Sequence, residues 1–367
     1  MRGVRVIGFV LLSSCVVLLG GGASAPAQSG DQNPLAGLRF YVDQESPSME
    51  QWRALERSGR HSKADLVWKI AREPKAVWVG RFTSPNFHVK VRRIFDNAHA
   101  QGAVPILTVL RAQSTGCSPT YDGGGPAEDA RTRAWYDDLA RAIGGDRVVI
   151  AFEPDSLGTI DCLARDRRQD RLNVLRYGVD RLSQLPNATI YLEAGASDWE
   201  PATRTAKQLR YIGISKVRGF MLNVTHHDWT HANVQHGMQI SRMVGGKHFI
   251  INTSYNGRGP IHYKRWINKA AHRWRRINVW CNPGLRGLGP APTTATAHPL
   301  VDAYMYINRP GYSAGSCNGG PLPVGTWWPE RGLMYATYAT DWESPPKGTV
   351  HGFFKRYSLR ALGAFRR

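Results

Sequence analysis

The sequence predicts an α/β protein built as a distorted, incomplete TIM-like barrel of about seven parallel strands. Seven short apolar runs, rich in β-branched and aromatic residues, recur along the chain, and helix-like stretches lie between most of them. The runs are apolar throughout instead of alternating, which is typical of parallel strands with both faces covered. Seven such strands over roughly 270 residues favour one barrel over two domains.

The expected strands lie, in chain order, at 77–83, 104–110, 148–154, 188–195, 217–224, 248–255 and 301–308. Residues 168–185 are an example of the helices expected between them. Their apolar residues recur every three or four positions, Arg and Asp fill the gaps, and Pro186-Asn187 ends the pattern. This periodicity predicts an amphipathic helix with one face on the sheet.

Polar side chains follow several of the expected strands. Glu153 and Asp155 end the third run, Glu193 ends the fourth and Asn223 ends the fifth. Because the carboxyl ends of parallel barrel strands gather on one face, we expect these groups to line a shared pocket, with Asp155 aimed into it. The alternative is that Glu153 or Asp155 caps the following helix, since Asp-Ser before Leu157 suits an N-cap.

The composition indicates a globular protein with a strongly basic surface. The chain has 367 residues, 42% of them hydrophobic, and 12 Trp, so it can bury a large core. The formal net charge is +20, which favours binding to anionic surroundings such as anionic polymers. The alternative is that this charge is only an adaptation of the protein surface to its habitat. Without zinc-finger spacing, a compact Lys/Arg block or an aromatic nucleic-acid signature, we expect no nucleic-acid partner.

The N-terminus has the pattern of a signal peptide. Arg2 and Arg5 precede the mostly apolar stretch 6–19, and Ala25-Pro26-Ala27 fits a small-x-small cleavage site. We therefore expect residues 1–27 to be removed and the mature chain to be secreted. Cys15 lies in a weak lipoprotein-like box, but apolar residues follow it, so we do not expect lipid anchoring. Residues 28–345 are then the barrel. Residues 346–367 form a basic tail that either lies on an anionic envelope surface or docks on the barrel.

The remaining cysteines are Cys117, Cys162, Cys281 and Cys317. An even number in an exported chain predicts two disulfides, with three connectivities open. The chain has no CxxC motif, which disfavours a metal site. The neighbouring His226, His227, Asp228 and His231 could be read as a metal cluster, but adjacent histidines on a strand point in opposite directions.

Aromatic residues gather in Gly-, Pro- and Asn-rich loops and at strand ends. They are Trp199, Trp280, Trp327, Trp328, Tyr41 and Tyr312. Aromatic faces beside Asn and Asp suit sugar rings, whose C–H faces stack while their hydroxyls form hydrogen bonds. Core packing explains any single Trp equally well. The prediction of sugar binding therefore depends on how many aromatic residues lie in loops.

Ordered motifs resemble glycoside hydrolase family 6, the inverting β-1,4-glucanases and cellobiohydrolases. The resemblance runs from about Asn33 to Asp341, and its most specific piece is I-A-F-E-P-D-S-L at 150–157. The other motifs occur at 33–43, 104–117, 190–199, 219–225, 251–260, 279–283, 293–304 and 307–317. The resemblance implies a distorted barrel with fewer than eight strands, no cofactor, no metal and a polysaccharide substrate.

The resemblance also implies roles for single residues. It makes Asp155 the general acid and pairs Cys117 with Cys162 and Cys281 with Cys317. The positions that it implies for sugar binding are Tyr41, Asp43, Trp199, Asn223, Trp280, Asn308 and Tyr312. Glu153 is expected on the same side as Asp155, because strand alternation gives both residues the same direction, so it is either the partner of the acid or structural.

The chain departs from the family pattern at several sites. Gly116 stands where the family has an Asp that supports the acid, and Ala314 stands where it has the proposed catalytic base. Further changes are Thr115 for Arg, Asn308 for Lys, Tyr312 for Glu, Ala196 for His, Asn252 for Asp and Tyr255 for Arg. The acid is thus kept, and the usual base is missing.

Three readings follow from the missing base. Another carboxylate acts, with Glu193, Asp198, Asp228 and Asp302 as candidates; water is activated through a proton relay; or the protein binds glycan without cleaving it. We expect a secreted, monomeric and divergent glycosidase that acts with inversion on β-1,4-glucan or a related polymer. The alternative is a catalytically silent glycan-binding or cell-wall protein on the same barrel. Loss of the Lys and Glu positions, together with the positive charge, makes anionic cell-envelope polymers a second class of partner.

Overall fold

The computed structural model describes Met1, Gly3 and residues 32–80, 86–112, 125–268, 270–271 and 273–346. The chain divides into a segment Met1–Asn33 and a unit Pro34–Arg367, and the description below concerns the second. Most of the expected signal peptide 1–27 and of the basic tail 346–367 lies outside the described residues, so both stay predictions. Within the described ranges, no helix combines the length and hydropathy of a transmembrane segment.

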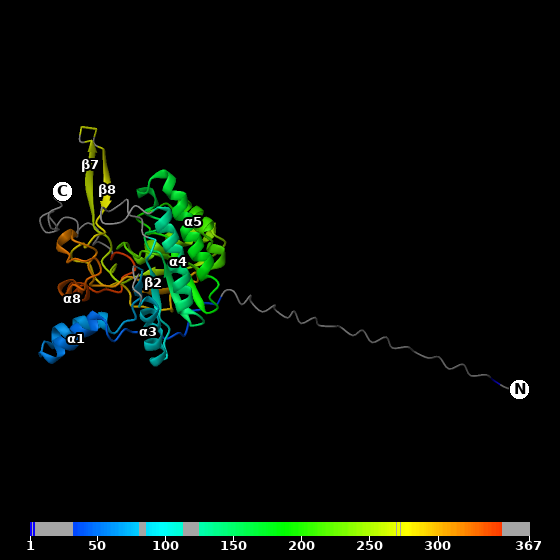
Figure 1. The fold of residues 1–367 in the computed structure, drawn as a ribbon, viewed down its shortest axis with the longest axis horizontal. Coiled ribbons are helices and arrows are strands. Elements are labelled where there is room, and N and C mark those ends of the chain that lie inside the picture. The colour runs from blue at the N-terminus through cyan, green and yellow to red at the C-terminus, as the bar shows by residue number, and fades with distance from the viewer. Residues whose placement is uncertain are drawn as a thin grey trace. The chain divides into compact units, whose positions relative to one another are not determined.

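Seven parallel strands form one sheet in the order β1-β2-β3-β4-β5-β6-β9, which confirms the predicted number and direction. Figure 1 labels one of them, β2, near the helices α3 and α4. The strands are β1 (Val77–Val79), β2 (Ile106–Val109), β3 (Val148–Phe152), β4 (Ala188–Glu193), β5 (Gly219–Leu222), β6 (His248–Asn252) and β9 (Val301–Met305). A parallel bridge between Lys75 and Tyr306 joins the two edges, and the Ala76 N–H donates to the Tyr306 carbonyl at 2.9 Å. The indole N–H of Trp78 on β1 also donates to the Ile307 carbonyl at 3.0 Å, so the two edges of the sheet meet.

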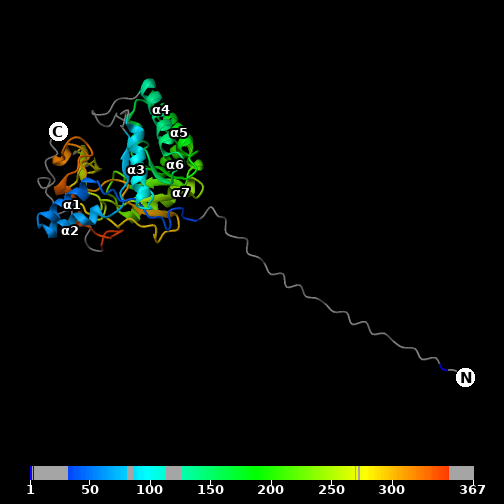
Figure 2. The same cartoon turned by 60° about the horizontal axis from the view of Figure 1, so that its bottom comes forward.

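Helices follow the first five strands and cover the outside of the sheet (Figure 2). These are α3 (Phe87–Ala100), α4 (Pro126–Ile143), α5 (Arg165–Leu182), α6 (Ala202–Ile212) and α7 (Thr230–Met243). The helix predicted at 168–185 is α5, which begins three residues earlier and ends where Ser183 caps it. The remaining helices are α1 (Pro47–Arg57), α2 (His61–Ala71) and α8 (Pro329–Thr337), and short 3-10 turns occupy Ile160–Cys162, Ile214–Lys216 and Cys317–Gly319.

Two apolar layers explain why the strands are apolar throughout. In β3, Val148, Ile150 and Phe152 pack toward the helices, while Val149 and Ala151 belong to a second cluster inside the barrel. The same alternation holds in β4, β5 and β6. Since both faces are buried, neither face selects polar residues, and the period of two disappears from the sequence.

An antiparallel hairpin interrupts the barrel between β6 and β9. Its strands are β7 (His262–Asn268) and β8 (Arg273–Asn278), and it stands out from the sheet in Figure 1. We did not predict this hairpin, because its strands are rich in Lys and Arg and contain no apolar run.

The disulfide between Cys281 and Cys317 is present and confirms one predicted pair. It joins the segment after β8 to the loops after β9. Cys117 lies outside the described residues, so its pairing with Cys162 stays a prediction.

The start of β5 sets a sharp packing constraint. A Cβ added at Gly219 would lie 1.8 Å from the main-chain oxygen of His248 on β6. Because backbone of the neighbouring strand cannot move aside cheaply, we expect Gly219→Ala to lower the free energy of unfolding by about 2–3 kcal/mol. Chemical denaturation measures the change. Gly145→Ala is the matched control, because a Cβ there has nothing within 4 Å, and equal effects of the two changes would contradict the prediction.

Candidate functional site

The loop after β3 carries the predicted acid in an unusual backbone conformation. Glu153 has φ 55° and Asp155 has φ 68°, with Pro154 between them. Left-handed backbone is uncommon outside glycine and costs on the order of 1–3 kcal/mol where the surroundings enforce it. Such residues cluster at functional sites, and these two lie at the carboxyl end of the sheet, where barrel enzymes build theirs.

The side chain of Glu153 fixes the position of this loop through hydrogen bonds. Its buried carboxyl accepts hydrogen bonds from the Arg111 N–H at 2.9 Å, the Ala112 N–H at 2.8 Å and the Tyr136 hydroxyl at 2.7 Å. Burial raises its pKa to about 7, although these hydrogen bonds act in the opposite direction. Glu153 thus ties the end of β3 to the chain after β2 and to α4.

The expectation that Glu153 and Asp155 point to the same side is wrong. The side chain of Glu153 reaches Tyr136 on α4, whereas that of Asp155 reaches Thr225 beyond β5. Strand alternation requires extended backbone, and both residues are left-handed. Of the two options left open for Glu153, its contacts favour the structural one.

Asp155 is only partly exposed and is held by a single side chain. The Thr225 hydroxyl donates to its Oδ1 at 2.5 Å. Burial raises the pKa of Asp155, while the Thr225 hydrogen bond and the neighbouring His226 lower it, and the net direction is upward. A carboxyl with a raised pKa keeps its proton nearer to neutral pH, as a general acid must.

Glu193 is a second carboxyl beside Asp155. It is the last residue of β4, is buried, and accepts a hydrogen bond from the Gly195 N–H at 2.9 Å. Burial and the negative charge of Asp155 raise the pKa of Glu193 well above its ordinary value. Two neighbouring carboxyls do not both ionise readily, so the pair tends to keep one proton.

A histidine and a carboxylate form a third cluster next to the acid. His226 Nδ1 lies 2.8 Å from Asp198 Oδ1, the amide of Asn278 also donates to Asp198, and His262 Nε2 lies 3.7 Å from it. Although burial alone would raise it, hydrogen bonds from the two histidines lower the pKa of Asp198. Trp199 stacks on the His226 ring, with centroids 4.7 Å apart and planes at 12°.

The aromatic residues predicted for sugar binding differ in exposure. Trp280 is 53% exposed, whereas Tyr41 is 4% exposed and packs against Ala98 and Ala103. Trp199 is partly exposed and Tyr312 is partly buried, with its edge toward Trp327 at 5.3 Å. Trp280 therefore offers the most open ring surface of the four.

The polar residues predicted for sugar binding are engaged by protein groups. The Asn223 amide donates to the carbonyls of Asp228 at 3.1 Å and Asn252 at 3.2 Å. The Asn308 amide donates to the Val224 carbonyl at 2.9 Å, and Asp43 accepts from the Tyr41 hydroxyl at 3.3 Å. Arg309, which we did not single out, places its guanidinium 4.3 Å from the ring centre of Tyr312.

Two of the four candidate bases, Asp302 and Asp228, are engaged by other protein groups. Asp302 pairs with Arg218 at 2.8 Å and with His248 at the start of β6, at the amino end of the barrel and away from Asp155. Asp228 accepts from the Ser197 hydroxyl at 2.6 Å and from the Trp229 N–H at 2.9 Å. Among the described residues, no cluster of His, Cys, Asp and Glu has the arrangement of a metal site.

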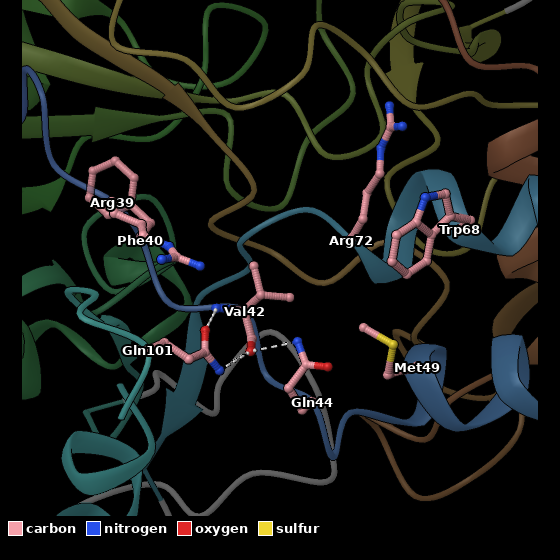
Figure 3. A pocket seen from close by; sticks show the side chains of 8 residues that line it. All are labelled: Arg39, Phe40, Val42, Gln44, Met49, Trp68, Arg72 and Gln101. Atoms are coloured by element: carbon pink, nitrogen blue, oxygen red, sulfur yellow. Dashed lines mark hydrogen bonds between the residues drawn. The ribbon is translucent and has the colours of Figure 1, made fainter. Parts of the chain in front are cut away.

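A pocket of about 340 Å³ lies away from this chemistry (Figure 3). Its lining consists of Arg39, Phe40, Val42, Gln44, Met49, Trp68, Arg72 and Gln101, with no Asp or Glu. Gln101 bridges the Val42 backbone, and Phe40 pairs with Val104 before β2, at the amino end of the sheet. The carboxyl groups at the opposite end, not this pocket, form the candidate active site.

Comparison with known sequences identifies one family. The sequence model described as "Glycosyl hydrolases family 6" matches residues 35–338. Endoglucanase A of Cellulomonas fimi is 34% identical over 302 residues, which make up 82% of this chain and 61% of that protein. Endoglucanase A of Thermobispora bispora is 27% identical over 305 residues, 82% of this chain and 62% of that protein. The chain thus spans about three fifths of the length of these two relatives.

Solved structures agree with the fold. The endoglucanase Cel6 from Mycobacterium tuberculosis, in complex with a methyl-cellobiosyl-4-deoxy-4-thio-β-D-cellobioside, is 35% identical. The match covers 84% of this chain and 99% of that chain, with a TM-score of 0.73. Endoglucanase CEL6B from Humicola insolens matches with a TM-score of 0.67 at 20% identity, which bears on the fold alone.

The hydrogen bond from Thr225 gives a test of the acid's environment. Thr225→Val removes a donor that favours the ionised carboxylate, so we expect the pKa of Asp155 to rise further. Carboxyl ¹³C NMR measures this pKa. Activity that needs protonated Asp155 is lost as the pH rises through the pKa of this residue. The alkaline limit of the pH–activity profile should therefore lie at higher pH in Thr225→Val. Thr159→Val, which removes a donor to the Asp155 carbonyl, is the control, and an unchanged or lower pKa in Thr225→Val would refute the assignment.

Proposed function

Because the chain belongs to the glycosyl hydrolases family 6, we propose that it hydrolyses β-1,4-glucan with inversion and that Asp155 is the general acid. The observation that carries the proposal is the state of Asp155: a partly exposed carboxyl at the carboxyl end of β3, in strained backbone, with a raised pKa. Glu153 shares the strained backbone and a raised pKa, but it is buried and bonded to three protein donors, so partial exposure is what sets Asp155 apart.

The proposed reaction uses the two carboxyls at the centre of the site. Protonated Asp155 donates its proton to the glycosidic oxygen as the bond to the anomeric carbon breaks, and water attacks that carbon from the opposite face. Glu193 is the neighbouring carboxyl, and the negative charge that Asp155 carries after it gives up its proton raises the pKa of Glu193. Trp199, Trp280 and Tyr312 are the proposed contacts for sugar rings.

We further propose that the protein is secreted after removal of residues 1–27. The proposal rests on the basic start, the apolar stretch and the small residues before Gln28. The disulfide between Cys281 and Cys317 fits an oxidising destination.

The reaction is tested by release of reducing ends from soluble β-1,4-glucans. We expect Asp155→Asn to lower kcat by at least about 100-fold, because general acid catalysis contributes that much. Proton NMR during hydrolysis should show the α-anomer first. Glucan binding without hydrolysis by the unaltered protein would instead favour a silent glycan-binding protein, a function to which the loss of a carboxylate at Ala314 also points.

The hairpin supports an anionic polymer as a further class of substrate. Lys264, Arg265, Arg273, Arg275 and Arg276 lie in β7 and β8, and neither strand contains Asp or Glu. The register places Lys264 opposite Arg276 and Arg265 opposite Arg275. The cationic residues of both strands would attract a polyanion.

The charge of the hairpin can be tested by binding. We expect the double change Arg275→Gln and Arg276→Gln to weaken binding of a carboxylated β-1,4-glucan about 3- to 10-fold and to leave binding of the neutral glucan unchanged. Isothermal titration at two salt concentrations measures both. Lys63→Gln, an exposed position on α2, is the control. Equal affinity of the unaltered protein for the neutral and acidic polymers would remove the basis of this proposal.

A further inference from the structure

An inverting glycosidase needs a second catalytic group besides its acid. A base on the other face of the sugar takes a proton from the attacking water, typically at about 6.5–9.5 Å from the acid. Ala314, where the resemblance places the usual base, has no group that can accept a proton. The inference below rests on the proposed function, because it concerns the base of the same reaction.

The carboxylates in the described part of the site are poorly suited to this task. Glu153 is buried and receives three hydrogen-bond donors, and Glu193 has its pKa raised beside the acid. Asp228 accepts from Ser197 and from main chain, and Asp198 accepts from His226 and Asn278. A carboxylate that is protonated, or that is saturated with donors, is a weak base.

His226 has the arrangement of an oriented general base. His226 Nδ1 lies 2.8 Å from Asp198 Oδ1 and 3.2 Å from the amide nitrogen of Asn278. In the tautomer that donates from Nδ1 to the Asp198 carboxylate, the lone pair is on Nε2. Within the described residues the hydrogen bonds of His226 use Nδ1; its side chain is 9% exposed, and Nε2 is not among the fully buried unpaired polar atoms. A carboxylate that fixes the tautomer of a histidine in this way is the construction used in catalytic triads.

The plane and position of the His226 ring are also fixed. Trp199 stacks on one face of the ring. The same Trp199 packs against Gly158, where a Cβ would lie 2.5 Å from the indole, so it also contacts the loop of the acid. Thr225, next to His226 in the chain, donates to Asp155. The acid and the histidine thus belong to one connected site.

We propose that His226, oriented by Asp198, is the general base of this enzyme. Nε2 accepts a proton from the water whose oxygen forms the new bond to the anomeric carbon. The bond from that carbon to the glycosidic oxygen breaks, and its electron pair takes the proton of Asp155. The products are an α-configured reducing end and a free 4-hydroxyl, with His226 protonated and Asp155 ionised until solvent exchanges the proton.

A glycosyl fluoride separates the base from the acid. β-Cellobiosyl fluoride needs little acid assistance, because fluoride leaves readily. We expect Asp155→Asn to keep most of its activity on the fluoride while it loses activity on cello-oligosaccharides. We expect His226→Gln to lose at least about 100-fold on both substrates. Azide, a nucleophile that needs no base, should restore turnover of the fluoride by His226→Gln and yield α-cellobiosyl azide.

Matched variants show whether a loss of activity in His226→Gln is caused by a change in structure alone. His231→Gln, on the exposed surface of α7, should behave as the unaltered enzyme. Asp198→Asn should lower kcat on the fluoride with little change in KM, because it favours the wrong tautomer. Thermal unfolding and cello-oligosaccharide binding are measured for each variant.

The outcomes distinguish the two proposals. An unaltered enzyme that hydrolyses neither substrate overturns the proposed function itself. An active enzyme whose His226→Gln variant keeps its activity, or loses it without azide rescue while still folded and binding, overturns the role of His226 alone. Formation of the α-azide by that variant supports it.

Discussion

The hydrogen bonding of Glu153 is the constraint on which the candidate site depends. Its buried carboxyl joins the end of β3 to the main chain after β2 and to Tyr136 of α4. A fully bonded buried polar group is rigid, since any movement leaves donors unpaired in a medium of low dielectric constant. That rigidity keeps Glu153 and Asp155 in left-handed backbone, and the left-handed turn directs Asp155 toward Thr225 and Glu193.

The carboxyl groups around this turn differ because their surroundings differ. Glu153 receives three donors, Glu193 has a carboxyl neighbour and little solvent, and Asp198 receives histidine and amide donors. Burial raises the pKa of the first two, while hydrogen bonds lower that of the third. Separation of pKa values within one site is how a single pocket supplies both an acid and a base.

The sequence was sufficient for the features that depend on chain-wide patterns and on motifs. The seven strands were predictable because burial on both faces makes each one apolar, and the Cys281–Cys317 pair followed from the family resemblance. The hairpin was missed because its strands are cationic. The direction of Glu153 was wrong because alternation presumes extended backbone. The relation of His226 to Asp198 and Asn278 could not be predicted, since three separate segments bring these residues together.

The hairpin joins the barrel at a point where its two ends already touch. The Val279 N–H donates to the Ile261 carbonyl at 2.9 Å, directly outside β7 and β8. A segment with adjoining ends can be lengthened, shortened or exchanged without displacing the strands on either side. The hairpin is therefore a module that evolution can alter independently of the barrel. One catalytic scaffold could acquire a preference for polymers of different charge by replacing this insertion while the acid and its supports stay unchanged.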